Sequence, residues 1–74
     1  MGKYDVEVEY LDEQGNVWDS SMRLMTDSYD EAYEFAMGIE LSNDKEQVAI
    51  WLWDEDGDFV EESLVVKEFG TKVG

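Results

Sequence analysis

The sequence predicts an α+β protein with the order ββαββ, in which a single antiparallel four-stranded sheet carries one helix packed on one face. Two regions of alternating apolar and polar residues each surround an acidic turn with a glycine, and a segment with helical spacing lies between them. The chain contains no proline, so every predicted strand keeps its hydrogen-bond donors. At 74 residues we expect one domain, residues 1–74, near the lower size limit for an unaided core.

The first predicted hairpin spans about residues 3–26. Residues 4–10 alternate without interruption, which indicates a strand with one buried face. The polar turn that follows contains Gly15, which can adopt the positive φ of a tight hairpin. In the returning strand we expect Trp18, Met22 and Leu24 on one face. The apolar face of the first strand consists of Tyr4, Val6, Val8 and Tyr10, and its polar face of Asp5, Glu7 and Glu9.

The spacing of apolar residues next predicts a helix over about residues 28–42. Ser28 and Glu31 have the spacing of a capping box, and acidic residues in the first turn suit the helix dipole. Gly38 weakens the last predicted turn. The core-facing residues are expected to be Tyr29, Ala32, Phe35, Ala36 and Ile39, and the solvent-facing ones Asp30, Glu31 and Glu34.

The second predicted hairpin spans about residues 47–69, with the last strand over residues 59–69. The two halves of the chain are similar at an offset of 42 positions, which brings Gly15 onto Gly57. A duplicated hairpin and a chance resemblance between two hairpins both account for this similarity. The offset also predicts which residues share the face away from the helix: Asp5, Glu7, Glu9, Asp19, Arg23, Trp51, Trp53, Glu61 and Val65.

The charge of the chain is its most unusual property. It has 20 acidic and five basic residues, which gives a formal net charge of −15. Disordered acidic segments contain few aromatic residues, whereas this chain has three Trp, four Tyr and three Phe. The composition therefore favours a folded domain with a dense negative surface. Self-repulsion destabilises such a domain. We therefore expect the negative surface to bind a partner with a positive surface, and many such surfaces bind nucleic acid.

Several function classes are disfavoured by the composition. The chain has no histidine and no cysteine, which removes disulfides, thiolate chemistry and the usual zinc and haem ligands. The first 20 residues lack the features of a signal peptide, and no apolar run approaches the ~20 residues that span a bilayer. We therefore expect a cytoplasmic protein with no membrane segment and no cofactor.

The acidic turns do not match a calcium site, and the chain has no catalytic motif. If Gly57 takes the sixth position of an EF-hand loop, Leu52 falls at the first position, which needs an oxygen ligand, and Ser63 at the twelfth, which needs a glutamate. No glycine-rich phosphate loop or nucleophile elbow is present, and no histidine could activate a serine. The sequence therefore predicts neither an enzyme nor a metal-binding protein.

The row formed by Asp5, Glu7 and Glu9 invites a comparison with DNA. Alternate residues of a strand lie about 6.6 Å apart, and two base steps along one DNA strand rise about 6.8 Å, so carboxylates in such a row match the spacing of phosphates. An ordinary solvated strand face is the alternative. The candidate partner-binding residues are Asp5, Glu7, Glu9, Asp19, Asp30, Glu31, Glu34, Trp51, Trp53, Asp54, Glu55, Asp56, Asp58, Glu61 and Glu62.

In charge, size and lack of histidine and cysteine, the whole chain resembles the small acidic DNA-mimic proteins that phages make. The resemblance implies a protein of the host cytoplasm that binds no nucleic acid itself. It would occupy the DNA-binding surface of a basic bacterial protein, with a histone-like HU protein as the leading candidate. The alternative is a protein–protein interaction or homodimerisation module that uses an exposed face containing Trp51 and Trp53, with acidity serving solubility. Those tryptophans could instead pack on each other and Val65, or under the C-terminal segment.

Overall fold

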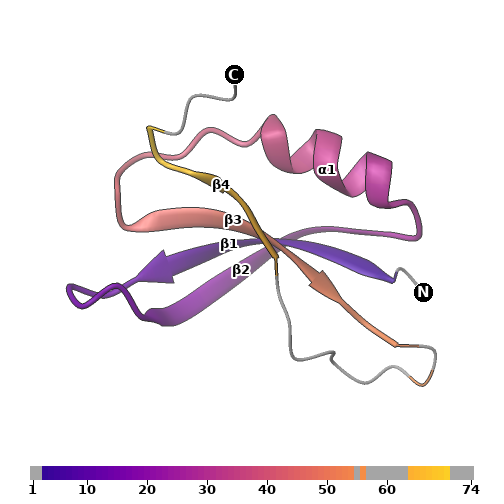
Figure 1. The fold of residues 1–74 in the computed structure, drawn as a ribbon, viewed down its shortest axis with the longest axis horizontal. Coiled ribbons are helices and arrows are strands. Elements are labelled where there is room, and N and C mark those ends of the chain that lie inside the picture. Colours follow the sequence, from indigo (N-terminus) through magenta and orange to yellow (C-terminus); the bar gives the residue numbers. More distant parts are fainter. Residues whose placement is uncertain (1–2, 55, 57–63, 71–74) are drawn as a thin grey trace.

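The computed structural model describes residues 3–54, 56 and 64–70, and it confirms the predicted ββαββ fold (Figure 1). The sheet has the strand order β2-β1-β3-β4 with antiparallel neighbours throughout, so β1 and β3 are its central strands. The helix crosses one face of this sheet. The elements are β1 (Tyr4–Leu11), β2 (Val17–Thr26), α1 (Tyr29–Met37), β3 (Glu46–Leu52) and β4 (Leu64–Glu68).

The core lies between the sheet and α1. As the alternation of β1 predicts, Val6 and Val8 are fully buried there, next to Val48 and Ile50 of β3. From the helix only Ala32 and Ala36 are buried, and their small side chains allow the helix to lie close to the sheet. Partly buried side chains at the edges complete this core: Tyr4, Tyr10, Leu24, Ile39, Leu41 and Val66.

The helix begins where the sequence predicts but ends earlier. Ser28 is the N-cap, and its side chain accepts a hydrogen bond from the Glu31 backbone N–H at 3.3 Å. The predicted span of residues 28–42 is wrong at its end, because α1 stops at Met37 and Gly38 caps it. The expectation that Phe35 faces the core is also wrong, since that side chain is 41% exposed.

Lys67 connects the end of α1 to the edge of the sheet. Its ammonium group donates hydrogen bonds to the carbonyl of Met37, at 2.9 Å, and to that of Ile39. A cation at this position satisfies carbonyls that have no partner within the helix and is favourable at the negative end of the helix dipole. Lys67 therefore joins β4 to the end of the helix.

The pairing of β2 with β1 departs from simple alternation. Register irregularities fall between Val6 and Glu7 and between Tyr10 and Leu11, so β2 carries extra residues opposite β1. As a result, the prediction that Trp18, Met22 and Leu24 share one face is wrong. Leu24 pairs with Val6 on the core side, Met22 pairs with Glu7 on the opposite side, and Trp18 is 67% exposed. Asp19 pairs with Tyr10 and so does not share the face of Glu7.

The two hairpins share irregularities at equivalent positions. The irregularity between Val48 and Ala49 of β3 lies 42 positions after the one between Val6 and Glu7. The turns correspond too, since the Asp12 side chain accepts from Gln14 N–H at 2.9 Å and the Asp54 side chain accepts from Asp56 N–H at 3.0 Å. The similarity of the halves thus extends from sequence to local geometry.

The two hairpins differ at their returning strands. β4 is described over Leu64–Glu68, five residues, whereas β2 has ten. The sequence predicts the last strand over residues 59–69, and the first five positions of that prediction lie outside the described residues. The register also differs by one residue, because Val6 pairs with Leu24, whereas the equivalent Val48 pairs with Lys67 and not with Val66.

Candidate binding face of the sheet

The face of the sheet that α1 does not cover contains most of the predicted site. We call it the open face. Its residues follow from strand alternation and from the observed register, which brings side chains of neighbouring strands opposite one another. They are Asp5, Glu7, Glu9, Met22, Met25, Gln47, Ala49, Trp51, Trp53 and Val65.

The predicted row of solvated carboxylates on this face is wrong. Asp5 is 4% exposed, Glu7 7% and Glu9 4%, so these three side chains are among the most buried polar groups of the described chain. The reason is the strand order, which places β1 between β2 and β3. Asp5, for example, has Met25 on one side and Trp51 on the other, and such large neighbours exclude water from the carboxyl groups.

Glu9 is fully engaged within the sheet. Its Oε1 accepts a hydrogen bond from Gln47 Nε2 at 2.8 Å, and its Oε2 accepts one from Trp51 Nε1 at 3.1 Å. Both donors come from β3, so these contacts join the two central strands across the open face. Buried polar groups are normally satisfied in this way, and Glu9 is therefore suited to a structural role.

Asp5, at the other end of the row, lies in a different environment. Burial raises its pKa to about 7, and the hydrogen bonding and charge of the neighbouring Glu7 act in the same direction, while a hydrogen bond with the Trp53 side chain acts against them. Its Oδ1 accepts no hydrogen bond from any described residue. A buried acceptor of this kind costs free energy until a donor reaches it, so Asp5 is the least satisfied member of the row.

Apolar side chains form the rim around these carboxyl groups. On β2, Met22 is 56% exposed and Met25 is 43% exposed, and on β4, Val65 is 38% exposed. Trp51 and Trp53 are half-buried on the same face. The open face therefore combines exposed apolar surface with buried acidic groups, an arrangement that differs from the solvated acidic surface expected from the sequence.

The remaining acidic candidates are distributed over other parts of the molecule. Asp30, Glu31 and Glu34 are exposed on α1, across the sheet from the buried row, and Asp19 is exposed on β2. Asp54 and Asp56 are exposed near the end of β3, where Asp54 stabilises the turn. Four candidates lie outside the described residues: Glu55, Asp58, Glu61 and Glu62.

The two acidic turns lie at opposite ends of the sheet. Tyr10, just before the first turn, pairs with Glu46 at the start of β3, whereas Leu52, just before the second, pairs with Tyr4 at the start of β1. Figure 1 shows the first turn and the end of β3 on opposite sides of the molecule. Exposed carboxylates of the described residues therefore surround the sheet instead of forming one row.

Three residues of the open face were not recognised from the sequence as site residues. Met22, Met25 and Gln47 flank the carboxyl row from the neighbouring strands. Alternation alone could have placed Gln47 on this face, two residues before Ala49. Met22 and Met25 lie on the same face only because of the bulge in β2, which the sequence does not reveal.

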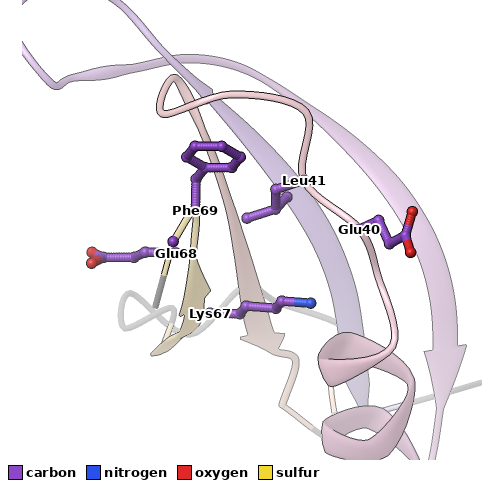
Figure 2. Close-up of a pocket in the computed structure, with 6 residues that line it drawn as sticks. Glu40, Leu41, Lys67, Glu68 and Phe69 are labelled. Atoms are coloured by element: carbon purple, nitrogen blue, oxygen red, sulfur yellow. The ribbon is translucent and has the colours of Figure 1, made fainter. Parts of the chain in front are cut away.

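A hollow of about 270 Å³ lies beside the end of β4. Figure 2 shows Leu41 and Phe69 on one side of it and the Lys67 side chain extending toward the helix. The ammonium group of Lys67 is already bound to helix carbonyls. The hollow is otherwise lined by Glu40, Glu68 and Gly70, so its lining contains no nucleophile next to a general base.

No protein-family model matches the chain, and no curated protein or solved structure shows significant similarity to it. Within the described residues, no three potential metal ligands converge on one point. The helix of the described chain is too short to cross a membrane.

Proposed function

We propose that this protein is a non-enzymatic binding module that docks through the open face of its sheet onto a basic surface of another protein. The observation that supports the proposal most strongly is the composition of this face, where Asp5, Glu7 and Glu9 lie buried among exposed apolar side chains. Apolar surface next to a few polar anchors is typical of protein–protein contacts. The absence of cysteine fits a protein of the cytoplasm.

The net charge favours a basic partner over a second copy of the chain. Two copies would each bring a charge of −15 and would place two rows of carboxyl groups against each other. Like charges that lose their water without gaining a partner are strongly destabilising. A partner with lysine and arginine side chains would instead pair with these groups and associate faster through long-range attraction.

DNA mimicry is the second candidate function, and the charge together with the exposed acids of α1 favours it. In this case Asp30, Glu31 and Glu34, with the acidic turns, would replace phosphates on the DNA-binding surface of a bacterial protein such as one of the HU type. The surface used would then be the helix side of the molecule instead of the open face. This difference makes the two candidates separable.

A pair of double variants tests the proposal. Met22→Ser with Met25→Ser changes the open face, and Asp30→Asn with Glu34→Gln changes the helix side; all four residues are exposed, so both proteins should fold. Wild type and variants are immobilised, and basic proteins are captured from bacterial lysate at about 50 mM and about 500 mM salt. Each captured protein is purified and its Kd measured with all three forms.

The proposed function predicts that the open-face variant weakens binding about tenfold or more, while the helix-side variant stays within about twofold of the wild type. The opposite order, together with displacement of DNA from the captured protein, would replace the proposal with DNA mimicry. Equal Kd values for all three proteins would contradict both. Circular dichroism of each variant provides the control for folding.

A further inference from the structure

We propose that the Asp5 end of the carboxyl row is a receptor for one guanidinium group, into which the partner inserts an arginine side chain that pairs with Asp5 and Glu7. The inference rests on the proposed function, because it names the chemical group by which a basic partner is recognised on the open face. It concerns these two residues alone, since both oxygens of Glu9 already accept hydrogen bonds within the sheet.

The first argument is the incomplete hydrogen bonding of Asp5. Its side chain is 96% buried, as its 4% exposure implies, yet Oδ1 has no hydrogen-bond donor among the described residues. Such groups are rare in native proteins, and each calls for an explanation. A donor that arrives with a partner would supply one, because the interaction would then be complete only in the complex.

No basic residue of the described chain supplies this donor. The described residues include four basic side chains, and each has another partner or another location. Lys67 binds carbonyls at the end of α1, Lys3 and Lys45 are exposed outside the strands, and Arg23 is exposed in the bulge of β2. A cation that pairs with Asp5 would therefore come from outside the described part of the chain.

The surroundings of Asp5 favour a guanidinium over an ammonium or a metal ion. A guanidinium is planar, weakly hydrated and able to donate to two carboxyl groups at once, and it stacks on aromatic rings. Asp5 has Glu7 beside it on the same strand face and Trp51 opposite it on β3. A metal ion would need more ligands than this, and no group of three converges among the described residues.

Access to Asp5 is controlled by flexible side chains. The β2 residues opposite Asp5 and Glu7 are Met25 and Met22, and both are largely exposed. Methionine is unbranched and changes conformation readily, which suits it to surfaces that adapt to a partner. An arginine side chain can therefore reach the carboxyl groups by displacing two methionine side chains, without movement of the backbone.

Binding of a guanidinium should be linked to a proton. In the free protein burial, followed by Glu7, raises the pKa of Asp5 to about 7, so a substantial part of the population carries a proton there at neutral pH. The facing residues of β2 and β3, Met25 and Trp51, do not titrate in this range. Arginine pairs with the ionised carboxylate, so its binding releases the Asp5 proton to solvent and becomes tighter as the pH rises.

The test is an NMR titration of the ¹⁵N-labelled protein with N-acetyl-arginine amide, compared with N-acetyl-lysine amide, at about pH 6 and about pH 8. We expect arginine to bind with a Kd on the order of millimolar, tighter than lysine and tighter at the higher pH. The shifted amides should cluster around Asp5 and Trp51. Glu7→Gln should weaken binding about fivefold or more, whereas its matched control Glu13→Gln, an exposed turn residue, should not change it.

Equal weakening by Glu7→Gln and Glu13→Gln, equal binding of arginine and lysine, or shifts spread over the acidic surface would overturn the arginine site. These outcomes are distinct from failure of the proposed function. If the methionine double variant abolishes partner binding while free arginine gives no localised shifts, the docking face stands and the arginine receptor does not. If arginine binds at Asp5 while the double variant binds the partner normally, the docking face is wrong.

Discussion

Replacement of Asp5 by asparagine should stabilise the protein at neutral pH, although it removes a buried polar group. The pKa of this carboxyl group is raised from 3.8 to about 7, chiefly by burial. An acid with a raised pKa in the folded state holds its proton more tightly there than in the unfolded chain. The folded state therefore binds more protons between pH 3.8 and about 7, and the free energy of unfolding decreases as the pH rises through this window.

The magnitude follows from the same values. One pKa unit corresponds to about 1.4 kcal/mol, so the difference between 3.8 and about 7 is worth at most about 4 kcal/mol. Asparagine resembles the protonated acid in shape and carries no charge, so it should retain the packing and avoid this penalty.

The assay is urea unfolding of wild type and Asp5→Asn at constant ionic strength, from about pH 5 to about pH 8. The difference in stability between the two proteins should grow by about 1.4 kcal/mol for each pH unit up to about pH 7 and level off above it. Asp44→Asn, which neutralises an exposed aspartate, provides the control for the general effect of net charge. A difference that is constant with pH, or equal to that of the control, would refute the reasoning.

Three further substitutions test the contacts that hold the fold. Gln47→Met keeps the size of the side chain but removes the donor to Oε1 of the buried Glu9, so urea unfolding should show a loss of about 1.5–3 kcal/mol, against no loss for the exposed Gln14→Met. Lys67→Met removes both hydrogen bonds to the helix carbonyls and should lower Tm by at least about 6 °C in a thermal melt, whereas Lys45→Met should not. Ser28→Ala removes the helix N-cap and should cost about 1 kcal/mol in urea unfolding; an unchanged midpoint would show that the cap contributes nothing.

The fold was predictable because its signals are local. The alternation in residues 4–10 depends only on which side chains point to the same side of a strand, and Val6 and Val8 indeed lie in the core. The N-cap at Ser28 likewise depends on residues within one helical turn. The early end of the helix could not be predicted as firmly, because the carbonyls of its last residues are bound by Lys67, which is 30 positions away from Met37.

The burial of the site was not predictable by the same means. Alternation places Asp5, Glu7 and Glu9 on one face, but it does not say which strands lie beside them. Their burial depends on the order β2-β1-β3-β4, which puts β1 in the centre, and on the bulge that turns Met22 toward Glu7. Both are tertiary features, since they arise from pairing between segments separated along the chain.

The buried carboxyl row has an energetic cost that distinguishes a binding group from a structural one. Glu9 repays its burial within the sheet through two hydrogen bonds, so replacing its partners should destabilise the protein. One oxygen of Asp5 has no donor, and replacement of Asp5 should stabilise the isolated protein while it weakens binding of arginine. One substitution is expected to raise stability and weaken binding where a buried group destabilises the free protein and gains its partner only in the complex. Replacement of a purely structural carboxyl group would lower stability and leave binding unchanged, and replacement of a solvated surface charge would change neither.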